Sequence, residues 1–247
     1  MTEQRAAGEG RGARAALPMA REMGKIGRCY NALREAYGER RNRPGHDPLD
    51  GLIGTILSQA TSDVNSSRAH RALRAAFPDW ETVLDTPDEI VADAIRSGGL
   101  ANLKARRIKE TLAALKERRG DLDLAFLDDL SLEEALAWLR GLPGVGPKTA
   151  ACVLLFDLGR PALPVDTHVH RVSRRLGLIG PKVNAERAHG ELQAQLRPEQ
   201  VYEFHLNMIA HGRRVCLAQR PRCTVCPLAH LCDYYQATRA HDAAGAT

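Results

Sequence analysis

Four cysteines near the C-terminal end of this 247-residue chain have the spacing of a metal site. They are separated by six, two and five residues, and they are Cys216, Cys223, Cys226 and Cys232. Four thiolates can bind a zinc ion or a [4Fe–4S] cluster. Zinc ribbons usually pair two Cys-x-x-Cys knuckles across a longer spacer, and only one such knuckle is present here. Spacing alone modestly favours the iron–sulfur cluster and leaves zinc as the alternative.

The segment that carries these cysteines is basic. No Asp or Glu occurs between Glu203 and Asp233, whereas four arginines lie before or within the cysteine loop: Arg213, Arg214, Arg220 and Arg222. One-sided positive charge of this kind suits the phosphate backbone of a nucleic acid duplex. A basic loop that contacts only solvent is the alternative, and the lack of any balancing acidic residue makes it the weaker one.

A glycine-rich turn at residues 141–149 could approach a phosphate group. Pro143 ends one helical segment, and Pro147 suits the first position of the next helix. A phosphate-binding P-loop needs Gly directly before Lys and a strand before the loop; here Pro147 separates the pair and a helix precedes the turn, so that motif is excluded. Backbone N–H groups at such a turn can bind a phosphate, whereas an αα-corner without a ligand fits the spacing equally well. The predicted contacts are Gly144, Gly146 and Thr149.

Two ionisable side chains lie at predicted helix starts. Lys148 falls in the first turn of a helix, where the helix dipole disfavours positive charge. Such an amine is better placed to act as a nucleophile than to stabilise the fold, and a simple phosphate contact is the alternative. Asp166 opens the next helix and suits its N-cap position. A carboxylate close to an amine nucleophile could also stabilise positive charge in a substrate and move protons.

The composition is that of an ordinary globular protein. Hydrophobic residues make up 44% of the chain and charged residues 26%, and no apolar run reaches the roughly 18 residues that a membrane helix needs. These values exclude collagen-like, disordered and membrane-spanning classes for the bulk of the chain. A net charge of +5 permits a nucleic acid partner without requiring one. The N-terminal segment lacks the apolar stretch of a secretory signal, so we expect a disordered tail on a cytoplasmic protein.

Apolar residues recur with helical spacing almost throughout the chain. Residues 49–59, 63–77 and 100–119 are predicted helices, and no segment alternates as a half-buried strand does. Thr86 and Ser131 each begin a capping box, which predicts a helix start at each point. Two cysteines lie alone within apolar helical patterns and are predicted core residues: Cys29 and Cys152. The chain is therefore predicted to be all-α.

Four segments, in this order, resemble the endonuclease III family of helix-hairpin-helix DNA glycosylases. They are LSQATSD (57–63), LPGVGPKTA (142–150), VDTHVHRVSRRLG (165–177) and the cysteine loop. The similarity runs from about residue 45 to residue 235. It implies a helix-hairpin-helix glycosylase fold with an active-site cleft between two domains. These are a six-helix barrel domain over residues 46–159 and a [4Fe–4S] cluster-containing helical domain over residues 25–45 and 160–236, and the flexible tails are residues 1–24 and 237–247.

The resemblance also implies a function, namely base excision repair by a DNA glycosylase with abasic-site lyase activity that removes oxidised pyrimidines from damaged double-stranded DNA. The damaged base is extruded, because its C1′ atom cannot be reached within the stack. Asp166 stabilises the oxocarbenium charge and helps to deprotonate Lys148, which attacks C1′ and forms a Schiff base with the opened sugar. β-Elimination then cuts the strand. The four cysteines hold a structural [4Fe–4S] cluster, and nothing in the sequence suggests a membrane partner or more than a monomer.

Three other functions are weighed against this one: a monofunctional mismatch adenine glycosylase, an abasic-site lyase with weak glycosylase activity, and a non-catalytic DNA-binding module. Lys148 opposes the first, because another residue stands there in the monofunctional relatives and water attacks instead. The sequence departs from the family pattern at Ala60, aligned on Asp63, where members usually have the Gln or Asn that fills the gap left by the flipped nucleotide. Either the neighbouring Gln59 fills that gap or another loop supplies the residue.

Overall fold

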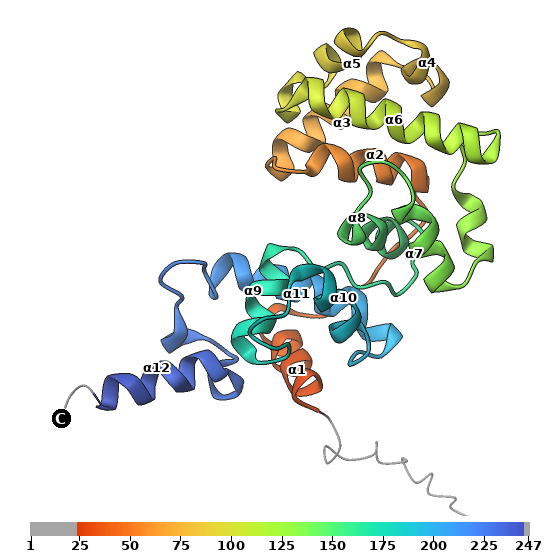
Figure 1. Ribbon diagram of the computed structural model, residues 1–247. Coiled ribbons are helices and arrows are strands. Elements are labelled where there is room, and N and C mark those ends of the chain that lie inside the picture. The colour runs from red at the N-terminus through yellow and green to blue at the C-terminus, as the bar shows by residue number, and fades with distance from the viewer. Residues whose placement is uncertain (1–23, 245–247) are drawn as a thin grey trace, which may run out of the picture.

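The computed structural model describes residues 24–244, and every regular element within that range is a helix. The helices gather around two hydrophobic clusters, which form the upper and lower parts of the molecule in Figure 1. The predicted all-α fold is confirmed. The tail predicted at residues 1–24 lies, apart from Gly24, outside the described residues. Within the described range, no helix is both long enough and apolar enough to cross a bilayer.

The first cluster is built almost entirely from aliphatic side chains. Phe77 and Trp80 are the aromatic members among its buried residues, and the others are mostly Leu, Ile, Val and Ala. The helices around it are α2 (Pro48–Ser58), α3 (Asp63–Ala76), α4 (Trp80–Asp85), α5 (Asp88–Ala94), α6 (Ala101–Arg119), α7 (Leu132–Arg140) and α8 (Pro147–Cys152). This part of the chain therefore follows the sequence order closely, with short loops between consecutive helices.

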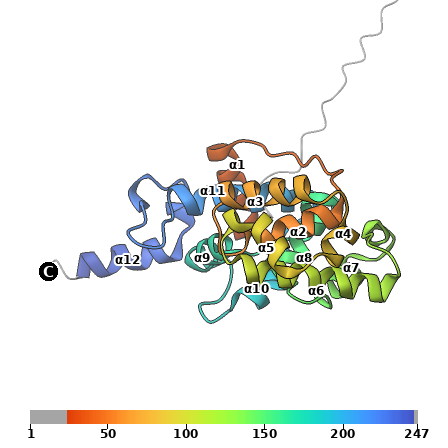
Figure 2. The same cartoon turned by 90° about the horizontal axis from the view of Figure 1, so that it is seen from above.

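The second cluster brings an N-terminal helix and the C-terminal helices together. α1 (Lys25–Tyr37) packs against α11 (Val201–Arg214), and α11 packs in turn against α9 (Thr167–Leu176). α10 (Ala185–Gln193) covers part of α9. The last helix, α12 (Asp233–Ala244), contacts α9 and projects to one side of the molecule in the view from above (Figure 2).

One helical segment belongs to both clusters. α8 continues directly into a π-helical turn, η3 (Val153–Asp157). Leu154 is fully buried in the first cluster, whereas Leu155 next to it is buried in the second. Turns of this type are rare and occur frequently at functional sites. Because these two leucines already serve different clusters, the domain boundary expected near residue 160 stays a prediction.

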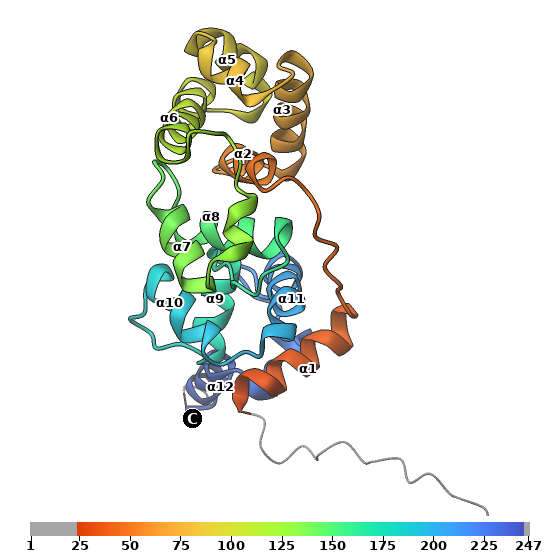
Figure 3. The ribbon, with the colours of Figure 1, turned by 90° about the vertical axis from the view of Figure 1, so that its right-hand side faces the viewer.

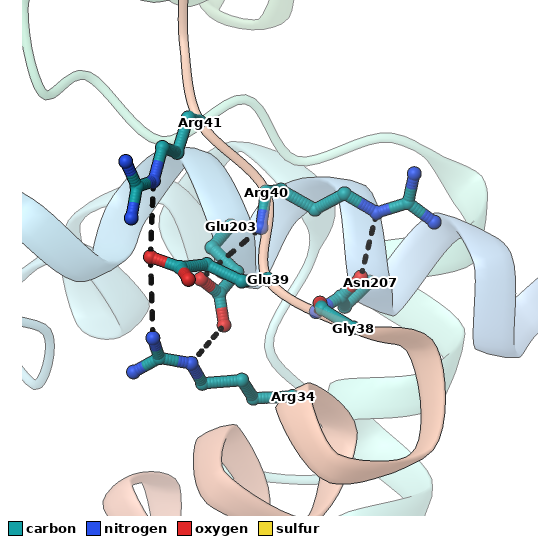
Figure 4. A network of polar contacts seen from close by, with 7 residues as sticks. All are labelled: Arg34, Gly38, Glu39, Arg40, Arg41, Glu203 and Asn207. Carbon is teal, nitrogen blue, oxygen red and sulfur yellow. Dashed lines mark hydrogen bonds and ion pairs between the residues drawn. The ribbon is translucent and has the colours of Figure 1, made fainter.

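The connector between α1 and α2 runs along the outside of both parts (Figure 3). A polar network on α11 holds it in place (Figure 4). Glu203, which is 4% exposed, forms an ion pair with Arg34 Nε at 3.5 Å and accepts the backbone N–H of Arg40 at 3.3 Å. Asn207, one turn further along α11, donates to the Gly38 carbonyl at 3.2 Å and accepts from Arg40 Nε at 3.4 Å. The buried carboxylate is thus matched by the charge of Arg34 in α1 and by an N–H of the connector, as a buried charge requires.

Local sequence signals set several helix ends. Ser131 forms the predicted capping box: its hydroxyl accepts the Glu134 N–H at 3.2 Å, and the Glu134 carboxylate accepts the Ser131 N–H at 2.9 Å. The capping box predicted at Thr86 is wrong. Pro87 is the N-cap of α5 and has no side-chain acceptor, and the Thr86 hydroxyl instead donates to the Thr82 carbonyl at 2.6 Å in the preceding helix.

The C-terminal end is helical further than the sequence predicts. Residues 237–244, expected to belong to a flexible tail, continue α12. The Arg239 guanidinium lies over the Tyr235 ring, 5.9 Å from its centroid. A side-chain pair four residues apart stabilises a helix locally, which accounts for order beyond the cysteine loop. Residues 245–247 lie outside the described residues.

Asp157 ends the π-helical turn in an unfavourable setting for a carboxylate. It approaches α2 so closely that a Cβ on Gly51 would lie 2.0 Å from its Oδ2, so a larger residue there would have to displace this carboxylate. Burial, and then the charges of Asp50 and Asp47, raise the pKa of Asp157 to about 7. At slightly acidic pH the native protein therefore holds a proton that the unfolded chain releases.

Asp157→Asn is expected to stabilise the protein at alkaline pH. A carboxyl whose pKa is raised in the native state costs stability as pH rises from about 4 to that pKa. We expect the variant to gain about 1–2 kcal/mol over wild type in urea unfolding at pH 8, after discounting the shift for solvent screening. At pH 5.5 the gain should fall by about half. The exposed Asp129→Asn is the control, and a gain that does not change with pH would contradict the assignment.

Candidate active site and cysteine loop

Lys148 is the second residue of α8, after the N-cap Gly146 and the first residue Pro147. Its half-buried side chain lies close to Cys152, one turn further along the helix. Burial raises the pKa of the Cys152 thiol, and the charge of Lys148 opposes that rise without overcoming it. The residue beside the amine is therefore a neutral thiol, and it is buried, as the sequence predicts.

Asp166 is the N-cap of α9, as predicted. Its Oδ1 accepts the backbone N–H of Val169 at 2.7 Å, and its side chain is half-buried. A carboxylate has two oxygens with several acceptor positions. The cap therefore leaves acceptor capacity on the second oxygen for a substrate or a proton.

Lys148 and Asp166 have two neighbours in common, Cys152 and His205. The charges of both act on the pKa of Cys152 and on that of His205, so the two side chains lie in one electrostatic neighbourhood. His205 is 3% exposed, and its Nδ1 is 2.9 Å from the Pro164 carbonyl oxygen, to which it donates. Burial lowers the pKa of His205 to about 4, against the opposing charge of Asp166. This neutral imidazole attaches the extended segment before Asp166 to α11, a role for which the sequence holds no local signal.

The predicted phosphate-binding turn forms the hairpin between α7 and α8. Gly144 adopts φ +75°, which favours glycine, and it is exposed. Gly146 has an ordinary extended backbone, and a Cβ there would meet nothing within 4 Å. Its missing side chain therefore leaves room for another molecule to approach the backbone. Thr149 is only 5% exposed, which makes it the least accessible of the three predicted contacts, and its role stays a prediction.

A second loop meets this hairpin through Arg107 of α6. Its Nη1 donates to Gln59 Oε1 at 3.1 Å, and its side-chain carbons lie 3.8 Å from the position of a Cβ on Gly144. Gln59 is thus tied back to α6. Ala60, next in the chain, is exposed at φ +52°, and Leu100 in the neighbouring loop is 59% exposed at φ +49°. Sequence reasoning missed Leu100, because an apolar residue after two glycines resembles an ordinary helix start.

The four predicted ligand cysteines are free thiols that line one pocket. Burial, with the mutual repulsion of the sulfurs, raises the pKa of Cys226 to about 11 and also raises those of Cys223 and Cys232. A bound metal centre displaces the thiol protons, and its positive charge offsets the repulsion between the resulting thiolates. No three His, Cys, Asp or Glu side chains of the described residues converge as ligands of a single ion would. The pocket also includes Arg175 and His211, which lie 3.3 Å and 3.6 Å from the sulfurs of Cys216 and Cys226. Four thiols surrounded by hydrogen-bond donors fit an iron–sulfur cluster, whose sulfurs accept such bonds.

Two arginines on α9 hold the start of the cysteine loop. Arg171 Nη2 donates to the carbonyls of Gly212 at 2.9 Å and Cys216 at 3.0 Å. Arg175, one turn later, donates to the carbonyls of Leu217 at 2.6 Å and Ala218 at 2.9 Å. The helix that begins at Asp166 therefore also fixes the loop that carries the cysteines.

The four arginines of the basic segment are exposed, but they are not equivalent. Arg213 Nη1 forms an ion pair with Asp63 Oδ2 at 2.9 Å, which joins α11 to the start of α3. The carboxylate neutralises part of the charge of Arg213. Among the described residues, no hydrogen bond or ion pair engages the guanidinium groups of Arg214, Arg220 and Arg222. These three side chains are available to an anionic partner.

Known proteins are similar in sequence to this chain over most of its length. Residues 53–198 match the HhH-GPD superfamily of base excision DNA repair proteins, and residues 216–232 match the iron–sulfur binding domain of endonuclease III. Endonuclease III of Thermotoga maritima is 38% identical over 79% of this chain and 87% of its own length. Endonuclease III of Escherichia coli K12 is 34% identical over 76% of this chain and 84% of its own. A putative DNA glycosylase of Arabidopsis thaliana is 39% identical over 67% of this chain, and the chain spans 56% of that protein.

Solved structures agree with the sequence comparisons. A non-covalent endonuclease III–DNA complex superposes with a TM-score of 0.73 at 30% identity, covering 89% of this chain and 100% of that chain. A trapped covalent endonuclease III–DNA intermediate gives the same TM-score and identity over 88% of this chain and 100% of that one. The chain belongs to the endonuclease III family of base excision repair DNA glycosylases and carries that family's iron–sulfur binding domain.

Proposed function

We propose that the glycosylase and lyase reactions of this enzyme both use one amine, Lys148 Nζ, with Asp166 as the carboxylate that assists it. The observation that carries this proposal is the shared neighbourhood of the two side chains around Cys152 and His205. Each also begins a helix, so each is held by backbone geometry. An amine and a carboxylate arranged in this way suit nucleophilic catalysis at an electrophilic carbon.

The reaction follows from these two groups. Once the lesion is extruded from the stack, Lys148 Nζ attacks C1′ of the sugar while the bond to the base breaks, and the base leaves as an anion that takes a proton from water. Asp166 stabilises the positive charge that develops on the sugar and takes up the proton that Lys148 loses. Opening of the sugar ring gives a Schiff base between Lys148 and C1′. Loss of a C2′ proton then expels the 3′ phosphate, which is the lyase step.

The substrate class that fits best is an oxidised pyrimidine in duplex DNA, recognised by a monomer. An amine nucleophile at Lys148 favours a bifunctional enzyme over a monofunctional mismatch adenine glycosylase. The hairpin at Gly144 and Gly146 would take a phosphate, and Arg214, Arg220 and Arg222 would contact the duplex backbone. Arg213 would contribute less, because Asp63 already pairs with it.

The gap left by the flipped nucleotide is better filled from the loop of Leu100 than by Gln59. The Gln59 amide is tied to Arg107, and Ala60 has no side chain long enough to reach into a base stack. Leu100 is apolar and exposed, and apolar side chains that enter base steps stabilise unstacked DNA. Of the two alternatives left open by the sequence, a second loop is therefore our proposal.

Cys216, Cys223, Cys226 and Cys232 are the proposed ligands of the [4Fe–4S] cluster. Bound there, the cluster would supply a rigid crosslink between the cysteine loop and the ends of α9, α11 and α12. Arg175 would keep the first ligand in place through its bond to the Cys216 sulfur. The basic side chains of the loop would then present a fixed surface to DNA.

Lys148→Ala is expected to abolish covalent trapping. With borohydride and a duplex carrying one thymine glycol, wild type should give a crosslinked product that the variant lacks, because no amine remains to form the Schiff base. Binding to the same duplex should change by less than about threefold. Lys182→Ala, an exposed lysine, is the control and should trap normally. Trapping retained by Lys148→Ala would refute the assignment of the nucleophile.

Leu100→Ala is expected to slow base excision from duplex DNA by about tenfold or more, since the unstacked state loses its filling group. Excision of thymine glycol under single-turnover conditions is the measurement. Leu103→Ala removes an equally apolar and 43% exposed side chain from the first turn of α6, directly after the loop of Leu100, and should leave the rate within about twofold of wild type. Equal rates for the two variants would return the gap-filling role to Gln59.

Cys223→Ser is expected to lower the iron content and to destabilise the cysteine loop, because a hydroxyl replaces one thiolate ligand. Iron analysis, absorbance near 400 nm and limited proteolysis of the C-terminal region would report the loss. Cys29→Ser, which alters a buried thiol of α1 outside the four proposed ligands, should keep its iron. An unchanged iron content in Cys223→Ser would remove this cysteine from the ligand set.

A further inference from the structure

One face of α6 contacts all three loops that border the proposed DNA-binding surface. Lys104, Arg107 and Thr111 lie at positions i, i+3 and i+7 and therefore share a side of the helix. Arg107 reaches Gln59 and packs beside Gly144. The Thr111 hydroxyl is 2.9 Å from the Pro143 carbonyl at the start of the hairpin. Lys104, nearest the start of α6, contacts the two loops that contain Ala60 and Leu100.

Lys104 is a fully buried cation without an acidic partner. It is 1% exposed, and its ammonium donates three hydrogen bonds: to the Leu57 carbonyl at 2.7 Å, the Gly98 carbonyl at 2.8 Å and the Thr61 hydroxyl at 2.6 Å. An ammonium has three donors, so each is used. Burial lowers the pKa of this lysine, which reflects the cost of keeping the charge in the interior.

The three acceptors belong to two separate segments of the chain, the end of α2 with the loop that follows it, and the short turn before α6. Leu57 and Thr61 flank Ala60, and Gly98 lies two residues before Leu100. Thr61 closes the arrangement, because its hydroxyl also donates to the Gly98 carbonyl. The Lys104 ammonium therefore stands where the two loops meet and joins their main chains.

Both loops hold strained backbone next to this lysine. Among the described residues, the non-glycine positions with positive φ are Ala60, Leu100 and Arg220. Two of the three thus lie on the loops that Lys104 joins. Left-handed conformations of such residues cost energy and persist only where surrounding contacts impose them, and they are frequent at functional sites.

We propose that Lys104 is a positioning residue that locks the loops at 57–61 and 98–100 into one rigid unit, so that Leu100 enters the base stack in a fixed orientation. This inference rests on the proposed function. Apolar packing would not replace the ammonium, because the carbonyls of Leu57 and Gly98 would lose a buried donor. Without the Lys104 ammonium, the strained residue of each loop can relax independently. Part of the binding energy must then be spent on ordering the loops, and less of it remains to open the base stack.

The test compares two substrates of the same enzyme. Lys104→Met keeps the length of the side chain and removes every donor. We measure excision of thymine glycol from a duplex, which requires the stack to be opened, and strand cleavage at an abasic site in a single strand, which does not. Lys109→Met is the matched control, because Lys109 is on the same helix and its ammonium bonds to Thr86 and Asp88 away from these loops. Circular dichroism establishes that each variant is folded.

We expect Lys104→Met to lose about tenfold or more on the duplex and to stay within about twofold of wild type on the single strand, while Lys109→Met changes neither. Equal losses on both substrates, or no loss on the duplex, would overturn the proposal. If Lys104→Met does not fold, Thr61→Val replaces it in the test. This variant removes one of the three acceptors and keeps the shape of the side chain. We expect a smaller loss on the duplex, again without a matching loss on the single strand.

A second measurement separates this proposal from the proposed function. An inactive wild type would refute the proposed function and not the role of Lys104. Fluorescence of 2-aminopurine placed beside an abasic-site analogue reports unstacking on binding without any chemistry. Wild type should raise this signal, and Lys104→Met should bind the duplex with at most half of that rise. An equal rise in both proteins would overturn the inference.

Discussion

The arrangement of the site depends on the packing of one short segment between two hydrophobic clusters. Leu154 is buried in one cluster and Leu155 in the other, and both lie in the π-helical turn that continues α8. Adjacent residues of a helix point in directions about 100° apart, so two consecutive leucines can face different clusters. Lys148 at the start of α8 is therefore fixed to the first cluster, and Asp166 at the start of α9 to the second. The distance between the amine and the carboxylate is set by how these clusters meet.

Loops in this helical protein are held by side chains that donate to main-chain carbonyls. Lys104 binds carbonyls of the two loops around Ala60 and Leu100, His205 binds that of Pro164, and Arg175 binds those of the cysteine loop. Carbonyls beyond helix ends have no partner in the helix, and buried ones need a donor. Long cationic or aromatic donors from a neighbouring helix supply it. Each of the predicted functional loops is thereby attached to a rigid element.

Much of the fold was predictable, because it depends on local signals that the sequence displays. The helical spacing of apolar residues and the Ser131 capping box gave the correct elements, and Asp166 is the N-cap it was expected to be. The prediction of a capping box at Thr86 was wrong, because the Thr86 hydroxyl donates instead to a carbonyl of the preceding helix. Lys104 and His205 carry no signal in sequence, since their partners are carbonyls of distant residues whose identity does not matter. The same reason hid Leu100, whose exposure depends on the loop beside it.

Lys148 and Asp166 occupy the same kind of position with opposite consequences for stability. An aspartate at an N-cap satisfies a free N–H and faces the positive end of the helix dipole, which stabilises a helix by about 1 kcal/mol. A lysine in the first turn faces the same dipole with the wrong sign, at a cost of about 0.3–1 kcal/mol. The carboxylate thus stabilises the helix that it begins, whereas the amine opposes the dipole of its helix. The unfavourable position of Lys148 therefore favours chemistry as its role over stability, whereas Asp166 can serve both.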